Sequence, residues 1–271
     1  MVERSLAWIA GRSPALKRRL WQAWYHVLSH TFQTEEITFL NYGYAEANPS
    51  GAGLTLRAED EPNRTCIQLY NRVAGAVDLK GREVLEIGSG RGGGCSYIAR
   101  YLGPKSVCGV DYSRKAIAFC QRVHSVESLT FQHGDAEALT FERERFDAVI
   151  NVESSHCYGS MDRFLSEAAR VLRPGGYLLW ADLRERDVAA RLSDQFKDAG
   201  FVAVEEEEIT SNVLRALDLD HERKRDFIAQ KAPKFAAGPV GAFAGLKGSA
   251  IYESMRSGRT VYLRCVLRKD G

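Results

Sequence analysis

Three glycines at alternate positions, Gly88, Gly90 and Gly92, stand directly between a short apolar run and a segment that can form a helix. Glycine adopts positive φ angles without strain and lets the backbone approach a bound molecule closely. The apolar run 84–87 predicts a strand, and the residues after the glycines predict a helix through Leu102. The glycine spacing alone is weak evidence, but a strand, a glycine turn and a helix in that order are typical of an open α/β sheet that binds a ligand at its first turn.

From residue 82 onward, short apolar runs alternate with helical segments. We expect seven strands, at residues 84–87, 107–110, 129–131, 146–151, 177–181, 201–209 and 260–267. We expect helices between them, including 113–124, 161–172 and 187–199. The stretch Arg173–Gly176, with its proline and two glycines, is expected to end the helix before it. The alternation predicts a doubly wound, Rossmann-like α/β fold with a seven-stranded, mostly parallel sheet.

The remaining segments predict helical additions to this sheet. We divide the chain into an N-terminal helical cap (1–80), a sheet core (81–210 and 258–271) and a helical lid inserted before the last strand (211–257). Aromatic residues of the cap follow roughly helical spacing: Trp8, Trp21, Trp24 and Tyr25. An ordered loop is expected over 41–51, and a further helix is expected after Pro62. Pro233 and the stretch 238–248 are expected to interrupt the helical insert.

Composition narrows the class of protein. A formal net charge of +2 and a pI of about 8.2 argue against an obligatory nucleic-acid surface. No apolar run approaches the length of a membrane span, so we expect no integral membrane contact. The six cysteines are scattered without a CxxC pair, and no Asp and Asn residues cluster as metal ligands, so we expect neither disulfides nor a metal, and a cytoplasmic location. The oligomeric state stays open, a homodimer included.

Acidic residues accompany the first three expected strands. Glu86 lies within the first, Asp111 ends the second, and Asp135 follows the third. A carboxylate at the end of the second strand can accept both hydroxyls of a ribose, and one after the third can accept from an adenine amino group. NAD is an alternative ligand, but a dinucleotide site faces a pyrophosphate and needs no acid after the third strand. A nucleoside without pyrophosphate fits better, although a purely structural turn with an acidic helix cap would give the same pattern.

Five stretches carry a specific set of motifs: Glu86–Gly92, Gly109–Tyr112, Gly134–Ala136, Phe146–Val149 and Arg170–Gly176. In combination they resemble the successive motifs of class I S-adenosylmethionine-dependent methyltransferases. The resemblance implies that S-adenosylmethionine is the cofactor. It also implies that Gly88 and Gly90 approach the methionine portion of this cofactor and that Asp111 binds its ribose.

The same resemblance implies how the adenine is held. Tyr112 is expected to pack on the ring, and Asp135 with Ala136 is expected to read its edge. We also assign Glu86, within the first strand, and Asn151, at the end of the fourth, to the cofactor site.

Four further stretches extend the likeness across most of the chain: 37–44, 60–64, 153–158 and 181–184. They resemble the phthiotriol/phenolphthiotriol dimycocerosate O-methyltransferases and related enzymes that act on polyketides, glycolipids and sugar-decorated natural products. The resemblance implies that the loop carrying Tyr42 closes over the methionine end of the cofactor. It implies a small-molecule acceptor of the polyketide, lipid or glycoside kind, although the segment 205–256 resembles the family much less.

Methyl transfer to an alcohol needs a group that removes the acceptor's proton. His156 follows the fourth strand and Asp182 ends the fifth, so both are expected at the rim where open α/β sheets bind ligands. A carboxylate on one imidazole nitrogen fixes the tautomer and stabilises the imidazolium that forms. In the enzymes that this chain resembles, this pair acts as a catalytic dyad, so we expect His156 as general base and Asp182 as the residue that orients it. The alternative is a loop histidine that caps the following helix.

Residues around His156 receive weaker assignments. Glu153 and Tyr158 are expected to contact the acceptor, although Glu153 is as well explained as an acid at a strand end. Cys157 has no positive neighbour in the sequence and is interpreted as a packing residue.

We therefore expect an O-methyltransferase that acts on a hydroxyl of a natural product. A second hypothesis is a homologue that binds the same cofactor but cyclises a polyketide. Methylation of carbon or nitrogen, and a module that binds without catalysis, also remain open. The histidine–aspartate pair favours oxygen because nitrogen needs less help from a base.

Overall fold

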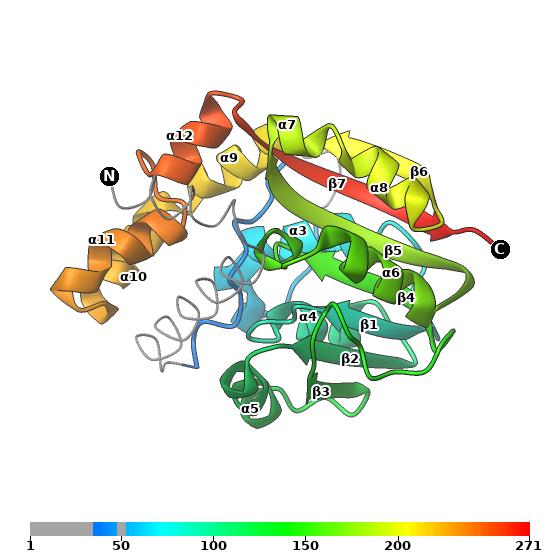
Figure 1. Ribbon diagram of the computed structural model, residues 1–271. Helices are drawn as coiled ribbons and strands as arrows, with labels where there is room; N and C mark the ends of the chain where they lie inside the picture. The colour runs from blue at the N-terminus through cyan, green and yellow to red at the C-terminus, as the bar shows by residue number, and fades with distance from the viewer. Residues whose placement is uncertain (1–34, 48–52) are drawn as a thin grey trace.

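The computed structural model describes residues 35–47 and 53–271, and its centre is a seven-stranded sheet in the order β3-β2-β1-β4-β5-β7-β6 (Figure 1). The strands are β1 (Glu83–Ile87), β2 (Ser106–Asp111), β3 (Leu129–His133), β4 (Phe146–Val152), β5 (Leu172–Glu185), β6 (Phe201–Glu208) and β7 (Thr260–Lys269). Strands β1 to β5 pair in parallel, whereas β7 runs antiparallel to both of its neighbours, β5 and β6. The predicted fold class is confirmed.

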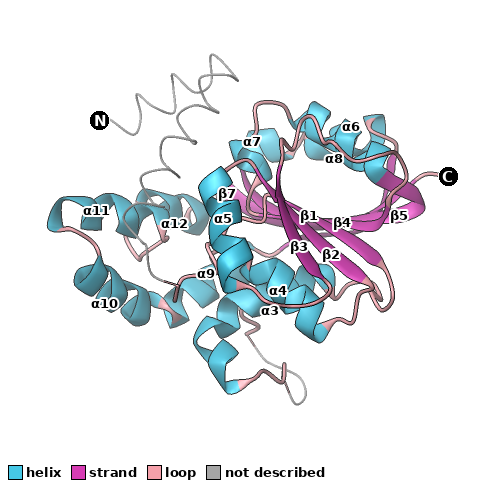
Figure 2. Ribbon diagram, turned by 90° about the horizontal axis from the view of Figure 1, so that it is seen from below, coloured by secondary structure: helices cyan, strands magenta, loops and turns pink. Residues whose placement is uncertain are grey.

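Helices cover both faces of the sheet (Figure 2). One face carries α3 (Arg64–Ala74), α4 (Gly93–Tyr101) and α5 (Arg114–Val123), and the other carries α6 (Met161–Val171) and α8 (Leu192–Asp198). Alternation along β1 explains this arrangement, because successive side chains of a strand point to opposite faces. Val84 packs into the core under α3 and α4, while Leu85 and Ile87 pack into the core under α6 and α8.

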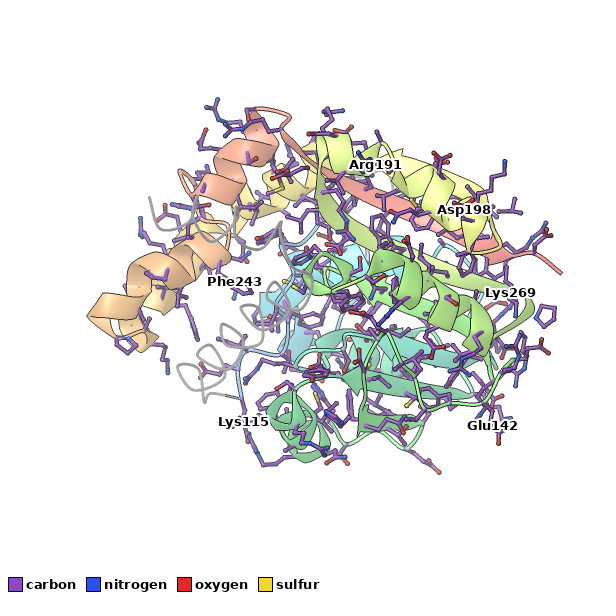
Figure 3. The ribbon with its side chains drawn as sticks, viewed as in Figure 1. Lys115, Glu142, Arg191, Asp198, Phe243 and Lys269 are labelled. Carbon is purple, nitrogen blue, oxygen red and sulfur yellow. The ribbon has the colours of Figure 1, made fainter. Side chains whose placement is uncertain are left out.

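Four helices form the insert between β6 and β7, at the end of the molecule away from the C-terminus (Figure 1). They are α9 (Thr210–Leu219), α10 (His221–Lys231), α11 (Lys234–Phe243) and α12 (Ala250–Arg256). Helices α10 and α11 share a small apolar cluster around Ile228 and Val240, against which Phe243, labelled in Figure 3, packs. Ile37 of the N-terminal loop joins the same cluster, so the insert and this loop pack together.

Three element boundaries differ from those expected. Helix α11 runs through Gly238 and Pro239, which were expected to interrupt it, whereas Pro233 does stand at its N-terminus. Strand β5 begins at Leu172, immediately after α6, because a register shift opposite β4 accommodates residues 173–176. The expected helix 187–199 is two pieces, α7 (Arg186–Ala189) and α8, because α7 buries no side chain whereas α8 buries Leu192 and Phe196.

The N-terminal part is described from residue 35. A 3-10 turn, η1 (Ala58–Asn63), contains Pro62 and leads directly into α3. The predicted aromatic helix with Trp8, Trp21, Trp24 and Tyr25, and the end of the predicted loop, lie outside the described residues. In the described part of the chain, no helix is both long and apolar enough to cross a membrane.

Candidate active site

The glycine-rich turn joins β1 to α4 and is folded back against the end of β2. Gly88 (φ +79°), Gly90 (φ +54°) and Gly92 (φ +78°) all have left-handed backbone conformations that favour glycine. The amides of Gly88 and Ser89 both donate to the carbonyl of Val110, at 2.7 and 3.0 Å. This pairing holds the turn at the carboxyl ends of the two strands, which is where parallel sheets bind their ligands.

The surroundings of the turn differ between Gly88, where a side chain would clash, and Gly90, where few atoms lie close. A Cβ at Gly88 would lie 2.3 Å from Ser154 Oγ, so a side chain does not fit there. Among residues 35–47 and 53–271, a Cβ at Gly90 would meet Leu40 alone, at 3.7 Å, so no described atom packs tightly against this side of Gly90. The turn therefore presents bare backbone to a ligand on the Gly90 side.

Asp111 stands at the end of β2 beside this turn. Its carboxylate accepts from the Gly90 amide (2.9 Å) and the Ser113 amide (2.8 Å), and burial raises its pKa. A carboxylate oxygen can accept two hydrogen bonds, so each oxygen of Asp111 can accept one more, from a ribose hydroxyl. Tyr112, the next residue, is 48% exposed, and its ring lies 5.8 Å from that of His133, so it stands at the edge where the adenine is expected.

Asp135 and Ala136 follow β3 at the same edge of the sheet. The amide of Gly134 donates to the carbonyl of Asp111 at 3.1 Å, which joins the two strand ends. The Asp135 carboxylate accepts from the Glu137 amide at 3.0 Å, and Ala136 is buried. The structure thus brings the residues expected around the ribose and the adenine to one edge.

Glu86 lies behind the turn and is completely buried. Tyr70 of α3 donates to one of its carboxylate oxygens at 2.6 Å, and the Cys95 thiol of α4 contacts the other at 2.8 Å. Burial raises the pKa of Glu86 to about 7, although the two donors act to lower it. Nothing in the sequence pointed to Tyr70 or Cys95 as its partners, because the contacts come from two separate helices.

Asn151 links the end of β4 to the glycine turn. Its side-chain amide nitrogen, which has two N–H donors, lies within hydrogen-bond distance of the Ile87 carbonyl (2.9 Å), Ser154 Oγ (2.7 Å) and the Tyr158 hydroxyl (3.0 Å). Tyr158, expected to contact the acceptor, therefore lies against the turn, next to Gly88.

Two buried polar atoms near the turn have no hydrogen-bond partner among residues 35–47 and 53–271, the side-chain oxygens of Ser89 and Asn151. Buried polar atoms are nearly always paired in folded proteins. A polar ligand at the turn would supply partners, so these atoms, the open space at Gly90 and the Asp111 carboxylate fit a nucleoside cofactor.

His156 and Asp182 meet where β4 and β5 end. His156 lies in the 3-10 turn η2 (Ser155–Cys157), and register pairing of Val152 with Ala181 places this turn beside β5. The imidazole Nδ1 is 2.7 Å from Asp182 Oδ1, and the His156 amide donates to Asp182 Oδ2 at 2.8 Å. Asp182 is fully buried, whereas the His156 side chain keeps 19% of its surface exposed.

The groups around the imidazole act against the effect of burial on its pKa. Burial disfavours the protonated ring, but the Cys157 sulfur and the Asp182 carboxylate raise the pKa of His156 above its ordinary value. Burial acts to raise the pKa of Asp182, yet His156 and Arg184 hold it well below its ordinary value. Cys157, interpreted from the sequence as a packing residue, follows His156 directly in the tight η2 turn, which is why its sulfur acts on the imidazole.

Glu153 connects three parts of the chain. Its backbone is left-handed (φ +47°), which is uncommon for a residue other than glycine. One carboxylate oxygen accepts from the Tyr42 amide (2.8 Å) and from the Tyr262 hydroxyl of β7 (2.9 Å). Burial raises the pKa of Glu153 to about 7 against the effect of these donors. Sequence reasoning missed Tyr262, since it is 109 residues away.

Tyr42 itself lies between the site and the insert. A Cβ at Gly245, after α11, would lie 3.2 Å from the Tyr42 ring. Burial, with Glu153 next in effect, raises the pKa of its hydroxyl. The loop 35–47 therefore touches both the Glu153 carboxylate and the helical insert.

The comparisons with known proteins agree with this geometry. Residues 85–180 match the family model described as a methyltransferase domain. The crystal structure of the (4+2)-cyclase SpnF has a similar fold, with a TM-score of 0.64 and 22% identity over 84% of this chain and 86% of that one. A putative sarcosine dimethylglycine methyltransferase from Galdieria sulphuraria has a TM-score of 0.67 at 12% identity, covering 91% of this chain and 98% of that one.

Curated relatives are closer in sequence. The phthiotriol/phenolphthiotriol dimycocerosates methyltransferase of Mycobacterium leprae is 39% identical over 94% of both chains. The fatty-acid O-methyltransferase of Mycolicibacterium smegmatis is 37% identical over 88% of this chain and 85% of its own. The fold and the motif matches define an S-adenosylmethionine-dependent methyltransferase. The chain belongs to the family of the phthiotriol/phenolphthiotriol dimycocerosates methyltransferases.

Proposed function

We propose that this enzyme methylates an oxygen atom of a lipid-type or polyketide-type small molecule, with His156 as the general base. The observation that carries the proposal is the 2.7 Å contact between His156 Nδ1 and Asp182 Oδ1 at the carboxyl ends of β4 and β5. The contact orients Nδ1 toward Asp182, so Nε2 is the ring nitrogen that would take the acceptor's proton. The names of the relatives, which methylate phthiotriol-type lipids and fatty acids, support a lipid-type acceptor.

The residues of the glycine turn and of the strand ends would hold the cofactor. Gly88 and Gly90 would meet its methionine portion, Asp111 its ribose, and Asp135 with Tyr112 its adenine. When bound, S-adenosylmethionine supplies an electrophilic methyl group on a positively charged sulfur. The chain's own contribution is to orient the acceptor and to take its proton.

The proton balance is simple. The methyl carbon would exchange its bond to the cofactor sulfur for a bond to the acceptor oxygen, leaving S-adenosylhomocysteine, and the O–H proton of the acceptor would pass to His156 Nε2. The imidazolium so formed is stabilised by Asp182, which holds Nδ1–H and stays ionised throughout. A fatty acid offers a carboxylate oxygen that is already ionised near neutral pH, so an acceptor of that kind would depend much less on His156.

Product analysis tests the proposal directly. The protein is incubated with S-adenosylmethionine labelled with ¹³C in its methyl group and with hydroxylated lipid or polyketide acceptors, and the product is examined by mass spectrometry and NMR. We expect a product heavier by one methylene group, with the labelled carbon bonded to oxygen. Label on carbon or nitrogen would overturn oxygen methylation, and an unlabelled isomer of the acceptor would identify a cyclase.

A further inference from the structure

Two cationic side chains share the Asp182 carboxylate from opposite sides. His156 Nδ1 lies 2.7 Å from Oδ1, and Arg184 Nη1 lies 3.0 Å from Oδ2. Asp182 is fully buried, and Arg184 is only 9% exposed. A guanidinium does not lose its proton in proteins, so Arg184 is a permanent counter-ion to this carboxylate.

The arginine is held firmly in this place. Its Nη2 donates to Ser155 Oγ at 2.7 Å, its Nη1 donates to the Leu183 carbonyl at 2.7 Å, and its guanidinium lies 5.3 Å from the centre of the Trp180 ring. Ser155 Oγ also accepts from Trp180 Nε1 (2.9 Å) and donates to Asp182 Oδ2 (2.7 Å). The serine hydroxyl thus uses one donor and two acceptor positions, its full capacity. Because Ser155 immediately precedes His156, the same network fixes the turn that carries the imidazole.

We propose that Arg184 is a positioning residue that shares the Asp182 carboxylate with His156, so that this carboxylate holds the imidazole proton less tightly than it would alone. The inference rests on the proposed function, in which His156 is the base. With Arg184 present, the buried Asp182 and Arg184 together are already neutral. Without it, the buried carboxylate would hold the proton of the imidazolium more tightly, which leaves less of the ring in the neutral form that can act as a base.

Other charged and titratable groups surround the imidazole. Cys157 follows it in η2, Glu153 precedes the turn after β4, Tyr42 approaches from the N-terminal loop, and Tyr262 lies on β7 behind Glu153. A substitution at Arg184 does not change the identity of these four residues. The change in the titration of His156 between variants therefore reports on Arg184.

NMR titration of the His156 ring, assigned with His156→Gln, tests the proposal in the full-length protein. Arg184→Gln keeps a hydrogen-bond donor but removes the charge, and we expect it to raise the pKa of His156 by about one unit or more. Arg184→Lys keeps the charge, and the pKa of His156 in this variant should stay within about half a unit of the wild-type value. Arg100→Gln serves as a matched control, since it removes an arginine from a partly buried pair with Asp60 (2.6 Å) elsewhere in the fold.

A pH profile of kcat/KM gives a second readout, and we expect its acidic limb to move to higher pH in Arg184→Gln by the same amount as the NMR pKa. Equal His156 pKa values in the wild type and a folded Arg184→Gln variant would overturn the proposal. If Arg184→Gln does not fold, a rise of about one unit or more in Arg184→Lys would overturn it instead. The NMR shift does not depend on turnover: if His156→Gln remained fully active, the proposed function would fail while the role of Arg184 in the titration of His156 would still be measured.

Discussion

At Gly88, both the backbone and the surrounding atoms exclude a side chain. The φ angle is +79°, and a Cβ would lie 2.3 Å from Ser154 Oγ and 2.9 Å from the Tyr158 hydroxyl. For Gly88→Ala we expect the free energy of unfolding to fall by about 2–4 kcal/mol, from backbone strain and the clash together. Displacing Ser154 and Tyr158 would also deform the turn, so S-adenosylhomocysteine, measured by calorimetry, should bind at least about tenfold more weakly.

Gly81 provides the matched control for this substitution. Its φ angle is +71°, but a Cβ there would meet no atom of the described part of the chain within 4 Å. Gly81→Ala should therefore cost about 1–2 kcal/mol of stability and leave the affinity for S-adenosylhomocysteine unchanged. Equal affinities in the two alanine variants would show that the close approach at Gly88 does not matter for the cofactor.

Glu86 makes stability depend on pH. Because its pKa is about 7 in the folded protein and about 4.5 when unfolded, folding is favoured by the protonated form. This contribution is complete below pH 4.5 and is lost as the pH rises to 7, which lowers the free energy of unfolding by something on the order of 3 kcal/mol. Glu153 likewise lowers the free energy of unfolding as the pH rises to 7. Asp182, whose pKa is lowered, reduces stability only as the pH falls below about 4.

In Glu86→Gln we expect the fall in stability between pH 4.5 and 7 to be smaller than in the wild type, because Glu86 no longer titrates while Glu153 and Asp111 still do. Urea unfolding at several pH values measures it. A slope as steep as that of the wild type would contradict the assignment of Glu86 as a buried carboxylic acid.

Among the elements, the loop 35–47 depends on a few hydrogen bonds to the rest of the fold. The Tyr42 amide donates to Glu153, and the Ala45 amide donates to the carbonyl of Asn212 in α9 at 3.2 Å. In Glu153→Ala, we expect the Tyr42 amide to exchange with deuterium at least about tenfold faster, since its acceptor is lost. The Ala45 amide is the internal control, and equal acceleration of both would mean that the whole loop unfolds rather than losing this one contact.

The elements also show what a sequence can and cannot predict. The strands from β1 to β5 follow from local apolar runs. The ends of β1 to β4 lie within two residues of the expected ones, whereas β5 extends beyond its expected bounds at both ends. The start of β5 at Leu172 depends on pairing with Phe146 of β4, and the break between α7 and α8 depends on which side chains find a core. Both depend on contacts distant in sequence, which periodicity does not contain.

For the whole molecule, the sheet order explains why the site could be anticipated. Parallel strands place their carboxyl ends at one edge, so Asp111, His156 and Asp182 could be assigned to that edge from their positions after strands. The residues that contact the site carboxylates could not be predicted in this way. Arg184 reaches Asp182, and Tyr262 of β7 reaches Glu153, through contacts that only the folded chain brings together. Residue type and spacing predicted where these side chains lie, whereas packing sets the direction in which their pKa values shift.

The role of His156 is tested most directly by comparing kcat and cofactor affinity in His156→Gln, with a hydroxylated acceptor established by the product analysis. Removing a general base should lower kcat by roughly a hundred- to ten-thousand-fold. The dissociation constant for S-adenosylhomocysteine should stay within about twofold of the wild type, since the glycine turn and Asp111 are untouched. A kcat within about threefold of the wild type, or a loss of cofactor binding as large as the loss of rate, would contradict the assignment of His156 as the base.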